Sequence, residues 1–210
     1  MRPTHRALAP LTLLLAALAG CSGSGGTAAQ ATGLEYADPG GAGWRLVRDP
    51  ASTSTRLVLD LVGPAGLMTR GAGFNLRAPA GVRFRSFESS GFPIEDAGVY
   101  ELLSTDGTGD PLEPRLLAGG VKPGNLLTVG IFQKDRRASA KDSGAPLARI
   151  ALELDGAAGL HAGDALALQV TKARYSPEDI GAFSPDPTQE MADKGKALDF
   201  TLAVGTLHAR

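Results

Sequence analysis

The feature that most constrains the fold is a two-residue alternation of apolar and polar side chains, which begins near Trp44 and recurs along the chain. It is clearest in residues 56–62 and 148–155, where every second residue is leucine, isoleucine or alanine. Such alternation is typical of strands buried on one face. No stretch of helix length carries a 3.6-residue apolar period. The chain is therefore predicted to be all-β.

Further strands follow from the same pattern. Residues 126–134 are apolar on both faces, which predicts a central or well-covered strand. Val82 and Phe84 are in phase with each other but Phe87 is not, so a strand end or a bulge is expected before Phe87. The remaining predicted strands span 72–78, 99–103, 115–118, 166–170 and 198–204.

The connections are rich in glycine, proline and aspartate. Residues 89–125 are the least regular part, and His161 to Asp164 predicts a tight turn. Ser176-Pro177-Glu178-Asp179 has the residues of a helix start, so a short helical turn is expected there and another over 188–194. Seven or more short strands without a long helix predict an antiparallel β-sandwich of the jelly-roll type with short helical turns in its loops.

The N-terminus differs from the rest of the chain. Arg2, His5 and Arg6 precede an apolar run from Ala7 to Leu18. A membrane span needs roughly 20 apolar residues, and this run is shorter and contains Pro10. Residues 1–20 are therefore predicted to be a cleaved signal peptide.

Leu18-Ala19-Gly20-Cys21 follows that run and resembles the lipobox of bacterial lipoproteins. Without the resemblance, Cys21 could also be an ordinary thiol beyond a standard cleavage site. The resemblance implies that Cys21 carries diacylglycerol and an acyl chain, which together anchor a protein stably. It also implies a bacterial cell envelope location on the outer membrane, facing the periplasm or the surface.

Residues 21–43 are mostly small and polar, which predicts a flexible tether in which Leu34 and Tyr36 do not touch the domain. The domain itself is predicted to be 44–210. Loss of residues 1–20 removes two of 21 basic residues and none of 22 acidic ones, which leaves a formal charge of −3. This charge argues against a nucleic-acid partner. Cys21 is the single cysteine, so an internal disulfide is excluded.

The order of the strands resembles the cohesin-like group of β-sandwiches. The resemblance lies in Arg56–Val62, Gly71–Leu76, Leu127–Phe132, Pro146–Leu154 and Gly163-Asp164 leading into Leu166–Val170. It covers roughly residues 44–207 and implies a non-catalytic jelly-roll that binds another protein or a glycan. In cellulosome cohesins the partner is a dockerin, held on one sheet face.

No constellation indicates catalysis, a metal or another cofactor. After signal cleavage His161 and His208 are the only histidines, and no Gly-x-Ser-x-Gly motif is present. Asp106, Asp110 and the pair Glu95-Asp96 could contribute to a calcium loop, but polar turn chemistry is the preferred interpretation. The aromatic residues outside the clearest core stripes, which could hold a glycan, are Trp44, Phe92, Tyr100, Tyr175 and Phe183.

Three functions remain open from the sequence. The first is a lipid-anchored, non-catalytic binding module with a protein partner. The second is carbohydrate binding through the same sandwich. The third is a hydrolase with an acidic site that the sequence does not reveal, which two carboxylates facing each other in a cleft would support.

Overall fold

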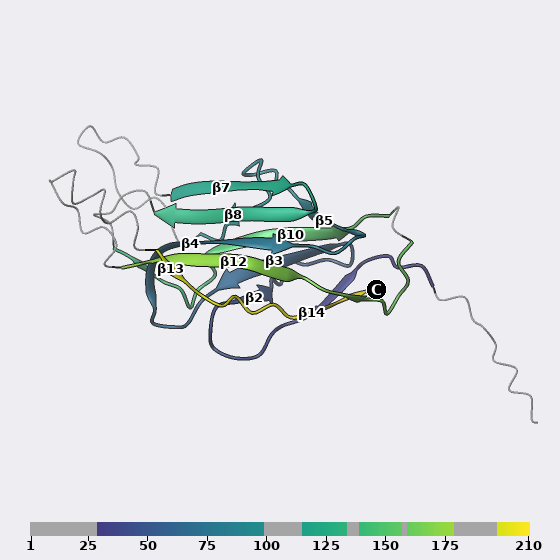
Figure 1. Ribbon diagram of the computed structural model, residues 1–210, viewed down its shortest axis with the longest axis horizontal. Coiled ribbons are helices and arrows are strands. Elements are labelled where there is room, and N and C mark those ends of the chain that lie inside the picture. The colour runs from purple at the N-terminus through teal and green to yellow at the C-terminus, as the bar shows by residue number, and fades with distance from the viewer. Residues whose placement is uncertain (1–28, 99–114, 134–138, 157–158, 179–196) are drawn as a thin grey trace, which may run out of the picture.

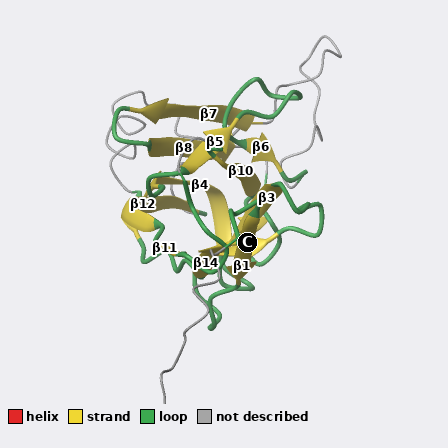
Figure 2. Cartoon of the chain, turned by 90° about the vertical axis from the view of Figure 1, so that its right-hand side faces the viewer, coloured by secondary structure: helices red, strands yellow, loops and turns green. Residues whose placement is uncertain are grey.

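The computed structural model describes residues 29–98, 115–133, 139–156, 159–178 and 197–210. Within these residues all regular structure is β, in two large antiparallel sheets and one small sheet. The two large sheets lie face to face, as Figures 1 and 2 show from two directions. The predicted antiparallel β-sandwich is confirmed.

The first large sheet has the order β2-β3-β10-β5, and β6 also pairs with β10. Its central pair places Leu59 opposite Ile150 and Leu57 opposite Leu152, so one face is continuously apolar. The alternation in residues 148–155 therefore predicted both the strand and its buried face correctly. The strands are β2 (Arg45–Arg48), β3 (Arg56–Val62), β5 (Val82–Arg85), β6 (Glu95–Asp96) and β10 (Ala148–Leu154).

The second large sheet has the order β13-β12-β4-β8-β7, with β9 paired to β4. β8 lies between β4 and β7, which confirms the predicted central strand over residues 126–133. The strands are β4 (Met68–Arg77), β7 (Arg115–Lys122), β8 (Leu126–Gln133), β9 (Lys141–Asp142), β12 (Gln169–Pro177) and β13 (Leu198–Asp199).

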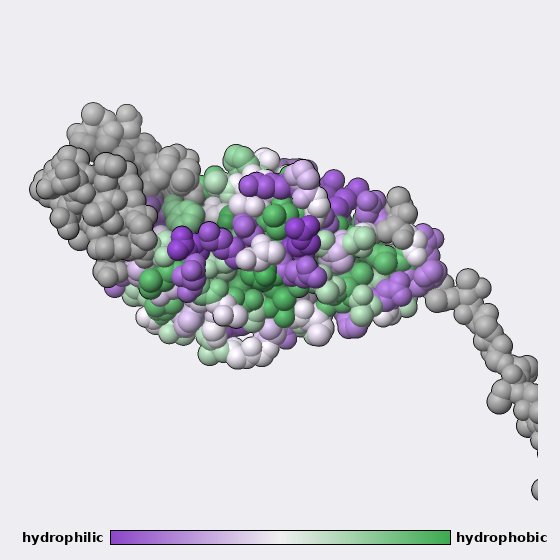
Figure 3. Space-filling model, in the orientation of Figure 1, coloured by the Kyte–Doolittle hydropathy of each residue, from purple (hydrophilic) through white to green (hydrophobic). Residues whose placement is uncertain are grey.

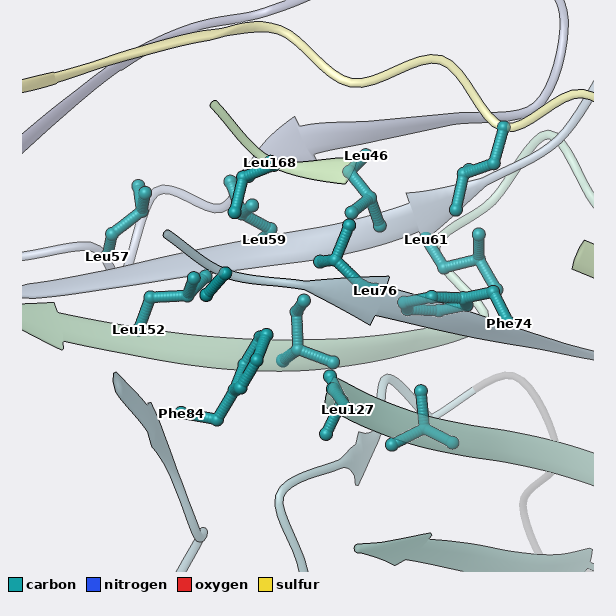
Figure 4. Packing of buried hydrophobic residues seen from close by; sticks show 14 of the residues in the cluster. Leu46, Leu57, Leu59, Leu61, Phe74, Leu76, Phe84, Leu127, Leu152 and Leu168 are labelled. Atoms are coloured by element: carbon teal, nitrogen blue, oxygen red, sulfur yellow. The ribbon is translucent and has the colours of Figure 1, made fainter. Parts of the chain in front are cut away.

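The core fills the space between the two large sheets. Leucines from β3 and β10 meet Phe74 and Leu76 of β4 and Leu127 of β8, and Figure 4 shows these side chains pointing toward one another. Leu59, Leu76 and Leu127 are fully buried. Apolar burial of this extent is the dominant stabilising contribution in a domain that cannot form a disulfide.

A small third sheet joins the two ends of the described chain. β1 (Leu34–Ala37) pairs with β14 (Thr206–Ala209), which also pairs with β11 (Ala165–Leu166). Leu34 and Tyr36 are buried, and the Tyr36 hydroxyl donates a hydrogen bond to the Leu46 carbonyl at 2.9 Å. The prediction that Leu34 and Tyr36 lie in the tether and do not touch the domain is therefore wrong. Two apolar residues in a polar stretch were too weak a signal to show a strand.

Two strands predicted as continuous change sheets. Residues 166–170 divide between β11 and β12, and residues 198–204 divide between β13 and a segment beside β2, where the Ala203 N–H donates to the Trp44 carbonyl at 2.9 Å. Alternation reports burial on one face but does not show which sheet supplies the hydrogen bonds. For this reason both strands were predicted to be longer than they are.

Two local predictions have different outcomes. β5 ends at Arg85, so the predicted end before Phe87 is confirmed. The predicted helical turn at Ser176 is wrong, because Ser176 and Pro177 end β12. Pro177 lies at the strand end, where its missing N–H costs no central pairing.

Some predictions lie outside the described residues. These are the strand at 99–103, the helical turn at 188–194, the aromatic residues Tyr100 and Phe183, the aspartates Asp106 and Asp110, and the whole segment 1–28 with Cys21. In the residues that are described, no helix is long and apolar enough to cross a bilayer.

Candidate functional site

The outer face of the second large sheet contains a hollow of about 490 Å³, which we call the outer groove. It is lined by residues of four neighbouring strands, β12, β4, β8 and β7. Figure 3 shows the surface in the orientation of Figure 1, with green and white patches among purple hydrophilic groups over these strands. The groove lies on the opposite side of the sheet from the core.

Small residues in adjacent strands create the groove. Gly73 of β4 pairs with Gly130 of β8, and Gly130 pairs with Ala118 of β7. Two residues further along the same strands, Thr128 of β8 pairs with Gly120 of β7. Three side chains that would normally stand on this face are thus absent and a fourth is a methyl group. The missing volume leaves the sheet surface hollow.

The ring of Phe132 lies across the glycines. A Cβ added to Gly130 would be 2.6 Å from Phe132 Cε2, and one added to Gly73 would be 2.9 Å from the Val129 carbonyl oxygen and 3.4 Å from Phe132 Cζ. The two glycines are therefore needed for Phe132 to lie close to the backbone. Phe132 itself is half-buried on the outer face.

The far side of the groove is open. An added Cβ at Gly120 would meet no atom within 4 Å, and Gly120 has no positive φ. By contrast, a Cβ on Gly119 would be 2.8 Å from Val129 Cγ1 and 3.1 Å from Ile94 on the core side. Position 120 can therefore accept a larger side chain that fills the groove, whereas position 119 cannot.

The charged residues that line the groove are all basic. They are Lys122 on β7 and Lys172 and Arg174 on β12. Arg174 is held by Asp199 of β13, with its Nε donating to Oδ1 at 2.6 Å. No carboxylate lines the groove. An apolar floor with a basic border favours a partner that presents apolar groups flanked by acidic ones.

One polar atom on the groove floor has no hydrogen-bond partner. Thr128 Oγ1 is buried and unpaired among the described residues. A hydroxyl in this position can donate to or accept from a group that enters the groove. Asn75, which pairs with Thr128 and with Lys172, is the other polar neighbour in this row.

The sequence did not identify this face. Gly73, Ala118, Gly120 and Gly130 are separated by up to 57 positions, and glycine in a strand usually indicates a bulge or a close approach. The shared feature is small residues at outward positions of three strands. That signal becomes readable only when the strand register is known.

Of the aromatic residues proposed for glycan binding, the three that the structure describes (Trp44, Phe92 and Tyr175) do not form a platform. Trp44 is buried and stacks on Phe200 with ring centroids 4.4 Å apart, and Tyr175 packs beside both rings. These three rings close one end of the core. Phe92 is exposed, with 43% of its surface accessible.

A second charged cluster lies on the outer face of the first large sheet. Arg149 of β10 stands opposite Asp60 of β3 and contacts three carboxylates. Its Nη2 is 3.3 Å from Asp49, its Nε is 3.4 Å from Asp60 Oδ1 and its Nη1 is 3.9 Å from Glu95. The Nε to Oδ1 contact lacks hydrogen-bond geometry, so both atoms have no hydrogen-bond partner.

The pKa of Asp60 is raised to about 7, chiefly by burial and also by repulsion from Asp49, against the opposing effect of Arg149. Asp49 and Asp60 are both only 5% exposed. Two carboxylates thus face each other, as the hydrolase hypothesis required, but neither lines the groove. A buried pair neutralised by an arginine is suited to a structural role.

The serines and histidines considered for catalysis have local roles. Ser52 Oγ donates to the Val58 carbonyl at 3.0 Å, and Ser90 Oγ donates to the Ile94 carbonyl at 2.8 Å. His161 begins the predicted tight turn, where its N–H donates to Asp164 at 2.8 Å. His208 is exposed on β14. In the described residues no group of three His, Cys, Asp or Glu side chains could hold a metal ion.

No family model matches the sequence, and no curated protein matches it. Among solved structures, the chain is similar to the sixth cohesin of scaffoldin B from Acetivibrio cellulolyticus, solved with a dockerin, at 9% identity. That match covers 80% of this chain and 97% of the cohesin with a TM-score of 0.47.

Two other cohesins have comparable values. A non-cellulosomal cohesin from the archaeon Archaeoglobus fulgidus is 11% identical over 65% of this chain and 78% of its own, with a TM-score of 0.42. A type I cohesin from Clostridium thermocellum is 10% identical over 68% and 87%, also with a TM-score of 0.42. With similarity this distant, the function has to be argued from the residues of this chain.

Proposed function

We propose that this chain is a non-catalytic binding module that holds a protein partner in the outer groove. The observation that carries the proposal is the cross-strand row of Gly73, Gly130 and Ala118, which leaves an apolar hollow on an otherwise solvent-facing sheet. An ordinary solvent-facing sheet surface carries side chains at its outward positions, whereas this row lacks most of them. Apolar hollows on a surface mark binding sites.

The chemistry of the groove favours a protein over a small polar ligand. Its lining is mostly backbone, aliphatic carbon and the ring of Phe132, and its charged residues are basic. A helix or loop that presents small apolar residues beside aspartate or glutamate matches both properties. The groove supplies burial for the apolar residues, while Lys122 and Lys172 select for acidic neighbours.

No observation favours carbohydrate binding or hydrolysis over protein binding. For carbohydrate binding, Trp44 is buried in the core and Tyr175 is half-buried against it. For hydrolysis, Asp49 and Asp60 are buried beside Arg149 and do not line the groove. Protein binding is the function that we retain.

The groove can be tested by filling it. Gly120→Trp places a large ring in the open side without backbone strain, because no atom lies within 4 Å of its added Cβ. Gly40→Trp is the matched control, since Gly40 is also exposed with nothing within 4 Å and does not line the groove. A photo-reactive amino acid at position 120 should crosslink a partner in native membranes, and the same residue at position 40 should not.

The partner captured at position 120 is then purified and titrated against the two variants. We expect Gly120→Trp to weaken binding by at least about tenfold and Gly40→Trp to leave it unchanged. Equal affinity of the two variants would show that the groove is not the binding surface. Loss of the crosslink after glycosidase treatment, but not after treatment with protease, would assign the groove to a glycan instead.

We further propose that lipid at Cys21 anchors the chain to a bacterial envelope membrane. The support is the resemblance of Leu18-Ala19-Gly20-Cys21 to a lipobox after a short apolar run. Cys21→Ala should move the protein from the membrane fraction to the soluble fraction and abolish incorporation of labelled fatty acid. Unchanged partitioning, with no label on the wild type, would contradict the anchor.

A further inference from the structure

β7 (Arg115–Lys122) is the last strand on its side of the second large sheet, and it is the outermost strand at the top of Figures 1 and 2. All eight of its residues pair with β8 on one side. From Leu117 to Lys122, no other described strand or loop forms a backbone hydrogen bond with it. Within the described residues, the N–H and C=O groups on its other edge therefore have no backbone partner.

The other edges of the two large sheets are shorter or covered. β2 has four residues, and the C-terminal segment lies against it, with the Leu46 N–H donating to the Ala203 carbonyl at 3.0 Å. β13 has two residues. Among the described strands β7 thus offers the longest uncovered edge.

The β7 edge also lacks the features that normally prevent strand addition. Proteins protect exposed edges with proline, inward charges, bulges or very short strands. Leu117 to Val121 contains no proline and no charge, and its pairing with β8 has no register shift. Val121 leaves 49% of its surface exposed at this edge. An unprotected edge of this length is a template for another strand.

We propose that the free edge of β7 binds an extended peptide segment of a partner protein by strand addition, and that this segment carries acidic residues at its ends. Free backbone groups in a straight row can be satisfied together only by an extended backbone. The sequence of β7 contains two basic residues and no acidic one, which favours carboxylates in the added strand. Val121 provides an apolar contact for one of its side chains.

The same charge argues against a second copy as the occupant. Self-pairing of β7 brings the basic residues of two identical strands to one interface without any acidic counterpart. Like charges across a strand pair are destabilising. Exposed Lys122, at the end of β7, would lie at this interface in each copy.

This edge is distinct from the outer groove, although both involve β7. Val121 does not line the groove, and its exposed position makes it accessible from the edge. The edge site therefore does not depend on the proposed groove function. A result at Val121 leaves the test at Gly120 unaffected, and the reverse also holds.

The test uses a capped synthetic peptide, Glu-Val-Thr-Val-Thr-Val-Glu, and the isotope-labelled chain. We expect the backbone amides of Leu117 to Lys122 to shift and to gain protection from hydrogen exchange when the peptide is added. A second peptide of the same sequence carries an N-methyl group on every residue, so it has lost the backbone donors on both of its edges. This peptide should not bind.

Variants locate the site and its charge preference. Val121→Asp should weaken peptide binding by at least about tenfold, because a carboxylate would face the acidic strand. Leu198→Asp is the matched control, since Leu198 is 48% exposed at the opposite edge of the same sheet. It should bind as the wild type does. A peptide with lysine in place of both glutamates should bind more weakly.

Several results would overturn the proposal. These are no shift in β7 at millimolar peptide, equal binding by the N-methylated and the unmethylated peptides, or shifts centred on Gly73 and Gly130 instead of the edge. Concentration-dependent dimerisation that Val121→Asp abolishes would assign the edge to a second copy and would also overturn it.

Discussion

The raised pKa of Asp60 predicts that part of the stability of this protein is lost as the pH rises toward neutrality. Asp60 is buried on β3 beside Asp49, and its pKa is raised from 3.8 to about 7 in the folded chain. In the unfolded chain the carboxyl has its ordinary pKa. Between these two values the folded state binds more protons than the unfolded state, so the free energy of unfolding falls with increasing pH.

The size of the effect follows from the two pKa values. Each pKa unit corresponds to about 1.4 kcal/mol, so complete titration of Asp60 removes roughly 4 kcal/mol of stability. Most of the change lies in the accessible range, and between pH 5 and pH 8 the expected loss is about 2–3 kcal/mol. Below about pH 3 and above about pH 8 this contribution no longer changes with pH.

Asp60→Asn isolates this contribution, because an amide has the shape of the protonated acid and does not titrate. Urea unfolding, followed by the fluorescence of Trp44, is measured for both proteins at pH 5 and pH 8. Trp44 is the single tryptophan and is buried in the core, so its emission reports global unfolding. We expect the wild type to lose about 2–3 kcal/mol relative to Asp60→Asn over this range.

Comparison of the two proteins cancels the titration of all groups that they share. Asp199→Asn is the control, because Asp199 is exposed and pairs with Arg174 at the surface. Its stability should follow that of the wild type at both pH values. If the free energy of unfolding of Asp60→Asn changes with pH by the same amount as that of the wild type, the proposed burial of a protonated Asp60 is wrong.

Three other substitutions test the packing, again by urea unfolding. Tyr36→Phe removes a buried hydroxyl with two hydrogen bonds and should cost about 1–3 kcal/mol; an unchanged stability would show that β1 is not tied to the domain. Gly71→Ala should cost about 2 kcal/mol or more, because Gly71 has a φ of 149° and its Cβ would collide with the Ile131 carbonyl; a neutral result would contradict this register. Arg149→Met should lower the free energy of unfolding by about 3–5 kcal/mol at pH 8 and by less at pH 5, where Asp60 is protonated. Equal losses at both pH values would show that Arg149 does not stabilise the ionised Asp60.

The local sequence pattern was sufficient to predict the fold class and the central strands. Leu57, Leu59 and Leu61 recur at every second position, which predicts that they share one face of a strand, because the side-chain period is two. Apolar residues on both faces likewise predicted that β8 lies between two other strands. Local turn chemistry was sufficient for His161 to Asp164, where the interacting residues are three positions apart.

The sequence was insufficient where a partner strand is distant along the chain. β1 forms because Leu34 and Tyr36 meet β14, about 170 positions later, and the two sheet-switching strands have their hydrogen-bond partners in different sheets. The same limit applies to Asp49, Asp60 and Arg149, which share a face only after β2, β3 and β10 have paired. Pairing between distant segments leaves little trace in the local pattern of either one.

The outer groove was decided entirely by the tertiary structure. Gly73, Gly130 and Ala118 are unremarkable one at a time, and they form a hollow only because the register of β4, β8 and β7 places them in one row. The edge of β7 likewise became a candidate site only when no neighbouring strand was found beside it. The local sequence predicts which face of a strand is buried, whereas register and sheet order depend on contacts between strands.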